Sequence, residues 1–172
     1  VWQVDGTRSW GESGALQFGG GVRRLRDDGY ELRLQTGTLP PVPVNLYRGS
    51  GPRSGFYLHQ TWAPARRMEF TAGGRWDRHE TSAQSVLSPY ASMAVSLWPS
   101  ARLHAGWGQA AQFPEINQFW SILGRRSLLP ERATHYQVSI EQRFGGRTRV
   151  RVEAYNRDDR DLLFRPLFDP RF

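Results

Sequence analysis

The sequence predicts an all-β protein: about eight long antiparallel up-and-down strands that form an incomplete segment of a large transmembrane β-barrel. Three observations predict this fold. Apolar and polar residues alternate along most of the chain, which is the period of a strand. Most of the alternating segments are about 9 to 14 residues long, more than the five or six usual in globular proteins. Short turns also alternate with longer polar connections.

The alternating segments succeed one another along the chain. Residues 1–8 are a weak first candidate, and Leu16, Phe18 and Val22 mark a second strand. Further strands are predicted around residues 56–62, 68–77, 87–98, 101–109, 136–144 and 148–157. In the segment 136–144 one face is apolar (Tyr136, Val138, Ile140, Phe144) and the other is polar (Gln137, Ser139, Glu141, Arg143). We expect the apolar face to contact lipid and the polar face to line a wet lumen.

The connections predict how the strands sit in a membrane. Residues 11–14, 63–66, 99–101 and 145–146 read as tight turns, while about 28–53, 81–86 and about 112–131 read as longer excursions. The last excursion contains a predicted short helix, Pro114 to Leu123. A membrane barrel shows this order, with short turns in the periplasm and long loops outside. Both chain ends then lie on the loop side.

The chain is therefore expected to be a single partial barrel segment over residues 1–172. Residues 165–172 are not predicted as a strand, because Pro166 and Pro170 interrupt the ladder. A fragment of this kind leaves two open sheet edges.

Composition narrows the function classes. Basic residues outnumber acidic ones by 23 to 16, and all of them are arginine. They are spread between apolar residues with no dense basic run, so nucleic acid is not an expected partner. The absence of cysteine rules out a disulfide scaffold and thiolate-bound zinc. No apolar run reaches the roughly 18 residues of a transmembrane helix, but a barrel hides its apolar band in alternate positions.

Three motifs in the second half of the chain occur in a specific order. The first contains Gly108, Phe113 and Pro114; the second contains Leu128 or Leu129, Pro130, Glu131, Ala133 and Tyr136; the third contains Tyr155, Asn156, Asp158, Asp161 and Leu162. Together they resemble the C-terminal part of the barrel of TonB-dependent outer-membrane receptors, over roughly residues 14–165. Leu129 and Ser139 depart from the family pattern, which has Lys or Arg and Gly at these places. The plug domain, the energy-coupling segment and the final strand are absent from this sequence.

The resemblance implies a transport function without covalent chemistry, in the outer membrane of a Gram-negative-type bacterium. Its implied partners are outer-membrane lipid, the plug domain, the TonB energy-coupling complex and a small ligand such as a ferric siderophore. An outer-membrane adhesin, a barrel enzyme and a soluble β-rich binding protein remain as alternatives. No catalytic set, metal site or cofactor motif is recognisable, and the four histidines lie on separate segments.

Two groups of residues are candidates for function. The long external loop offers ligand contacts, because loops carry binding residues on a fixed scaffold: Gln112, Phe113, Glu115, Asn117 and Trp120. Alternatively, this loop only folds over the mouth with its aromatic residues packed. The second group is expected to face the lumen or plug: Glu131, His135, Arg75, Arg102, Arg143, Arg149 and Arg151. These arginines would give a positive lumen, suited to anionic ligands.

Two smaller features have structural and functional readings. Glu131 could contact the plug or substrate, but an ion pair with an inward arginine such as Arg102 is the favoured interpretation. The glycines of 18–24 are expected to let the wall twist or the plug approach, rather than to cradle phosphate. The acidic run 158–161 is read as a solvated loop rather than a calcium site.

Overall fold

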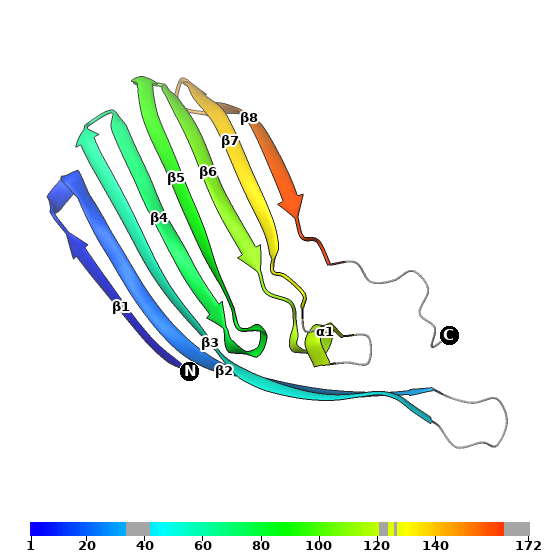
Figure 1. The fold of residues 1–172 in the computed structure, drawn as a ribbon. Helices are drawn as coiled ribbons and strands as arrows, with labels where there is room; N and C mark the ends of the chain where they lie inside the picture. Colours follow the sequence, from blue (N-terminus) through cyan, green and yellow to red (C-terminus); the bar gives the residue numbers. More distant parts are fainter. Residues whose placement is uncertain (34–41, 121–123, 126, 164–172) are drawn as a thin grey trace.

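A computed structural model describes residues 1–33, 42–120, 124–125 and 127–163; for 31–33 and 42–45 it describes only the backbone. The described chain forms one sheet of eight antiparallel strands in sequence order (Figure 1). The strands are β1 (Trp2–Ser9), β2 (Gly14–Arg33), β3 (Val42–Ala65), β4 (Met68–His79), β5 (Gln84–Trp98), β6 (Ala101–Gln112), β7 (Glu131–Phe144) and β8 (Thr148–Arg160). β1 and β8 do not pair with each other, so the sheet is an unclosed, partial barrel.

The register separates the residues of the sheet into two faces. Trp107 lies opposite Tyr136, and Ile140 lies between Leu103 and Val152 of the neighbouring strands. These residues share one face, called here the outer face. His104 lies opposite Ser139 opposite Glu153 on the other, the inner face. The same parity runs through β4 and β5, where Phe70 faces Met93 and Thr71 faces Ser92. The register therefore divides residues 136–144 into the same two faces that the sequence predicts.

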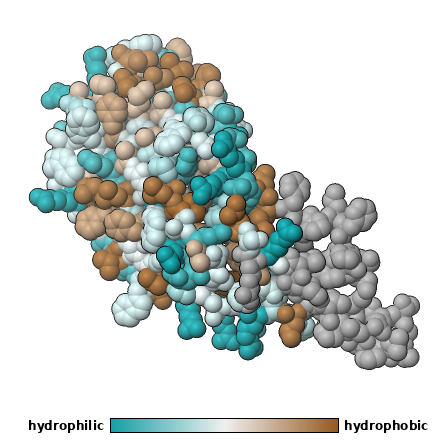
Figure 2. All heavy atoms as spheres, in the orientation of Figure 1, coloured by the Kyte–Doolittle hydropathy of each residue, from teal (hydrophilic) through white to brown (hydrophobic). Residues whose placement is uncertain are grey.

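Burial on these faces is the reverse of that in a water-soluble sheet. Large apolar side chains of the outer face are exposed, including Val138 at 52% and Val152 at 64%. Two polar residues of the inner face are instead buried, Ser139 at 1% and Asp77 at 8%. In Figure 2 apolar and hydrophilic patches alternate across the visible surface.

The turns lie at one end of the sheet and the longer connections at the other (Figure 1). At the turn end are the 3-10 turn η1 (Gly11–Ser13) and the short connections at 66–67, 99–100 and 145–147. β1 begins and β8 ends at the loop end, as the alternation of connections predicts. The turn predicted at 63–66 is displaced, because β3 runs to Ala65 past an irregularity after Trp62.

Two connections differ from the sequence-based expectation. Much of 28–53 is strand, since β2 continues to Arg33 and β3 starts at Val42. We call residues 24–33 and 42–52 the arm; in the described chain they pair only with each other and project beyond the other strands (Figure 1). The connection expected over 81–86 contains only the 3-10 turn η2 (Glu80–Ser82) and Ala83. Ala83 adopts a left-handed backbone conformation with φ of 54°, and this conformation closes the turn before β5 begins.

The connection between β6 and β7 spans residues 113–130 and contains the helix α1 (Ile116–Trp120). This helix begins two residues after Pro114, and the predicted extension over 121–123 lies outside the described residues. The prediction for residues 165–172 lies outside them as well. Within the described part of the chain, no helix is long and apolar enough to cross a membrane.

Candidate functional site: the inner face and the loop docked on it

The inner face carries a ladder of ion pairs. Arg102 lies 3.4 Å from Glu69 on β4, and Arg151 lies 2.7 Å from Glu153 on its own strand. Glu141 lies between Arg143 at 3.6 Å and Arg149 at 3.8 Å. The pairs form along one strand, as between Arg151 and Glu153, or diagonally across strands, as between Arg149 and Glu141, because inward side chains of the sheet share one face.

This ladder corrects the expectation of a positive lumen. Each of the predicted inward arginines, Arg75 included, lies within 4 Å of a carboxylate of the same wall. The wall's own carboxylates therefore offset these charges. The inner face is a polar surface of balanced charge, which suits a wet lumen but gives no preference for an anion.

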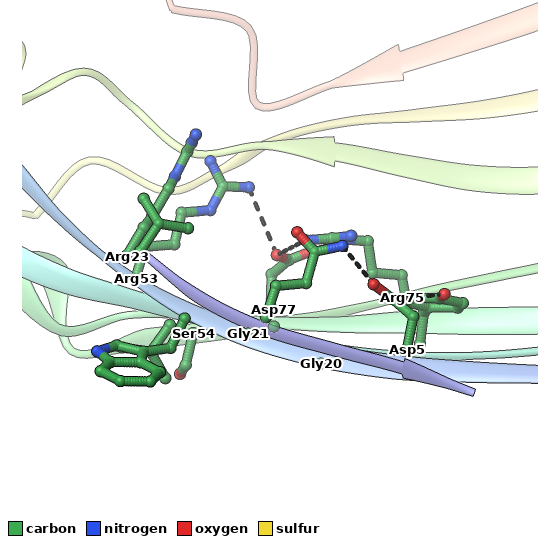
Figure 3. Close-up of a pocket in the computed structure, with 14 residues that line it drawn as sticks. Asp5, Gly20, Gly21, Arg23, Arg53, Ser54, Arg75 and Asp77 are labelled. Carbon is green, nitrogen blue, oxygen red and sulfur yellow. Dashed lines mark hydrogen bonds and ion pairs between the residues drawn. The ribbon is translucent and has the colours of Figure 1, made fainter.

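The most buried ion pair of the inner face is centred on Asp77. Arg75 donates to both of its carboxylate oxygens, through Nε at 2.6 Å and Nη2 at 2.9 Å. Arg53 from β3 approaches the same carboxylate to 3.6 Å. Arg23 on β2 stands opposite Arg53 and extends the cationic side of the cluster (Figure 3). Around this cluster is a depression of about 390 Å³.

A second polar contact closes the β1 side of this depression. Tyr57 donates its hydroxyl to Asp5 at 2.7 Å, and Gln3 donates to the other oxygen of Asp5 at the same distance. Gly19 lies opposite both residues, and a Cβ there would meet Asp5 and the Tyr57 ring. Gly19 in the glycine-rich stretch 18–24 thus makes room for a cross-strand tyrosine.

The loop between β6 and β7 docks at the loop end of the inner face. His79 is 2% exposed and stacks between Phe113 and Phe119, with ring centroids at 5.5 Å and 6.0 Å. The guanidinium of Arg53 lies 5.2 Å from the centroid of the Phe113 ring, a cation–π contact. Ile116 is buried against the arm, where a Cβ on Gly49 would collide with it. This packing fixes the position of α1.

His79 lies beyond the apolar band of the outer face. The last apolar outward residue of β4 is Trp76, and the next, Arg78, is charged and pairs with Glu80 at 2.7 Å. Burial lowers the pKa of His79 below its ordinary value of 6.5, and the charges of Arg53 and Arg23 lower it further. A neutral imidazole therefore stacks between the two phenylalanines at neutral pH.

The structure separates the predicted ligand-loop residues. Phe113 is buried in the loop packing, and Asn117 is half-buried. Gln112, Glu115 and Trp120 are exposed at the loop end of the molecule. The side-chain amide oxygen of Asn117 is buried with no hydrogen-bond partner among the described residues.

Glu131 and His135 both lie on the inner face of β7. The carboxylate of Glu131 accepts a hydrogen bond from the backbone N–H of Leu163 at 2.8 Å. The ion pair suggested between Glu131 and Arg102 is not formed, because the two residues lie at opposite ends of their strands; Arg102 pairs with Glu69 instead. His135 stands opposite Gly108 and Arg157 in the register.

Two further predictions concern metal binding. The acidic run 158–161 was predicted to be a loop, but its residues 158–160 pair with β7 as the end of β8. Asp158 lies 3.1 Å from Arg160, and Asp159 lies 2.7 Å from Arg157. Within the residues that the structure describes, no three or more His, Asp or Glu side chains are grouped so as to hold a metal ion.

The family model described as "TonB dependent receptor-like, beta-barrel" matches residues 1–171 of this chain. The chain belongs to the TonB-dependent receptor β-barrel family. This confirms the resemblance carried by the three motifs of the second half of the chain. A search of curated protein sequences finds no match to this TonB-dependent receptor sequence.

Two solved structures share its fold. The siderophore receptor PirA from Acinetobacter baumannii has a TM-score of 0.75 at 14% identity, over 93% of this chain and 26% of that one. The copper transporter OprC has a TM-score of 0.67 at 16% identity, over 89% of this chain and 29% of that one. The chain thus spans less than a third of either structure, and at such identities the likeness shows the fold alone.

Sequence reasoning missed the residues that anchor the site: Asp77, His79, Arg53 and Asp5. A usable signal was present for two of them, because Asp77 and His79 share the strand parity of Arg75. Arg53 lay in a stretch interpreted as loop, so its parity could not be assigned. Asp5 lay in the weakest strand candidate.

Proposed function

We propose that this chain forms part of the wall of a TonB-dependent receptor in the bacterial outer membrane. One observation carries the proposal: in the half of β2 to β8 nearer the turns, the antiparallel sheet exposes large apolar side chains on one face and pairs charged side chains on the other. A water-soluble sheet would bury the apolar face, whereas a barrel wall presents it to lipid. Closed pairing of both sheet edges would come from the other strands of the intact receptor.

The transport role we propose is energy-coupled uptake of a scarce ligand such as a ferric siderophore. The family assignment supports uptake through a barrel that houses a plug and couples to the TonB complex. The names of the two structural neighbours, a siderophore receptor and a copper transporter, both point to metal acquisition. In this role the wall performs no covalent chemistry. Its balanced inner face would contact the plug and the ligand's path.

Within this role, the exposed loop residues Glu115 and Trp120 contact the ligand, and Phe113 holds the loop in place. The test is uptake of radiolabelled ferric siderophore by iron-starved cells that carry the intact receptor. Glu115→Gln and Trp120→Ala together should lower uptake several-fold. The control is Trp62→Ala, which removes an outer-face tryptophan near the turn end and should leave uptake unchanged. Unaltered uptake in the double variant would contradict the assignment of this loop.

The membrane placement has a separate test. The intact receptor, extracted from cell envelopes, should stay folded only in detergent or lipid and should migrate differently on gels before and after heating. A receptor that is folded and monodisperse in buffer without detergent would contradict the proposed wall.

A further inference from the structure

Arginines gather on the outer face at the loop end of the sheet. On β4 and β7 they follow the last apolar outward residues, Trp76 and Tyr136. On β2 and β3 they lie between Val22 or Phe56 and the outward arm residues Tyr30 and Leu46. The arginines are Arg24, Arg26, Arg48, Arg78, Arg132 and Arg160. On the turn half of β2 to β8, the described outward strand residues carry no charge. Within β2 to β8 the outward arginines therefore lie at the loop end, whereas Arg8 on β1 and Arg66 and Arg67 in the β3–β4 turn lie at the turn end.

Three of these arginines form a concave site at the base of the arm. Arg24 and Arg26 on β2 and Arg48 on β3 line a depression of about 450 Å³ together with Ser50. Arg26 lies 3.8 Å from Asp28, and both side chains are more than half exposed, so this pair is weak. Among the described residues, no carboxylate pairs with Arg24 or Arg48.

An apolar depression adjoins the cationic one. It has a volume of about 460 Å³ and is lined by Trp2, Val22 and Pro52, and it shares Arg24 and Ser50 with the cationic depression. Trp2 lies opposite Val22, and Pro52 lies opposite Arg24, so all of them belong to the outer face. The combined site presents guanidinium groups on the loop side and an apolar surface on the band side.

We propose that Arg24, Arg26 and Arg48 bind the phosphate group of a lipid in the outer leaflet, with the apolar part of the lipid against Trp2, Val22 and Pro52. Guanidinium groups match phosphate oxygens in geometry and keep their charge at any physiological pH. Cationic side chains just beyond an apolar band lie at the level of lipid head groups. The site faces away from the lumen, so a transported ligand does not reach it. This inference rests on the proposed membrane placement.

The test uses the intact receptor in nanodiscs of phosphocholine lipid doped with phosphatidic acid, followed by native mass spectrometry. Wild type should retain phosphatidic acid through partial delipidation. The triple variant Arg24→Gln, Arg26→Gln, Arg48→Gln should bind it roughly 100-fold more weakly, from about a factor of five for each head-group arginine. The matched control removes the same charge near the turn end: Arg8→Gln, Arg66→Gln, Arg67→Gln should retain the lipid as wild type does.

Three results would overturn the proposal. Equal retention of phosphatidic acid by the triple variant and the control would show that the arm arginines do not bind it. Displacement of the lipid by millimolar inorganic phosphate alone would assign the site to free phosphate. A receptor that does not insert into nanodiscs would contradict the proposed wall and this site with it, whereas an inserted receptor without lipid preference would contradict the site only.

Discussion

Replacing Asp77 with Asn removes the charge that holds two arginines together on the inner face. The carboxylate of Asp77 receives two short hydrogen bonds from Arg75 and lies 3.6 Å from Arg53. Breaking a fully buried pair costs about 3–5 kcal/mol. The side chain of Arg75 is 54% exposed, however, so water screens part of this interaction. We therefore expect the free energy of unfolding to fall by about 2 kcal/mol, close to the value of hydrogen bonds to charged groups.

The assay is urea unfolding of the intact receptor in lipid vesicles, followed by tryptophan fluorescence. The control is Asp158→Asn, which breaks an ion pair with Arg160 in which both side chains are at least half exposed. That variant should lose between about 0 and 1 kcal/mol. If Asp77→Asn and Asp158→Asn destabilise the receptor equally, burial of Asp77 has no energetic consequence and the reasoning fails.

Three further predictions follow from the same faces. Val138→Arg places a charge near the middle of the lipid face and should lower the free energy of unfolding in vesicles by about 2–4 kcal/mol. Phe144→Arg, near the turn end, should lower it by about 0–1 kcal/mol. Equal losses would contradict the apolar band. Gly49→Val should displace α1, seen as faster amide exchange over 116–120, because a Cβ at this position meets Ile116; unchanged exchange would refute the docking contact. Folding lowers the pKa of His79, so the neutral imidazole stabilises the docked loop above pH 6.5, and this stabilisation is lost as the pH falls through the lowered pKa. Amide exchange in 113–120 should therefore accelerate as the pH is lowered from 6.5. Exchange that does not accelerate would contradict the stacking.

Strand parity is the part of the fold that the sequence predicts most directly. In β7 the alternation from Tyr136 to Phe144 is broken only by Gln142 on the apolar face, and its two faces appear in the register as predicted. Parity is decided by the period of the strand alone, so it does not depend on knowing the neighbouring strands. The short turns could also be predicted from local sequence, because glycine and proline mark them.

The arm could not be predicted, because it lies outside the apolar band. Its strands carry charged residues on both faces, such as Asp28 on the outer face and Asp27 on the inner face, and such a composition is typical of a loop. Only pairing between β2 and β3, thirty or so residues apart in places, makes these segments strands. The ion-pair partners were missed on similar grounds. Parity places Arg102 on the inner face, but the choice between Glu69 and Glu131 depends on register, which no local pattern encodes.

The central claim is that the outer face of this sheet contacts lipid and the inner face water. Because the sequence contains no cysteine, single cysteines introduced at each position from 136 to 143 report on one site at a time. In the intact receptor in vesicles, a membrane-impermeant thiol reagent supplied from the aqueous phase should label cysteines at 137, 141 and 143, whereas a cysteine at 139 should react slowly because this position is buried. Cysteines at 136, 138 and 140 should be protected from this reagent and should be labelled by a lipid-soluble one. Labelling with no two-residue period, or with the opposite period, would contradict the account.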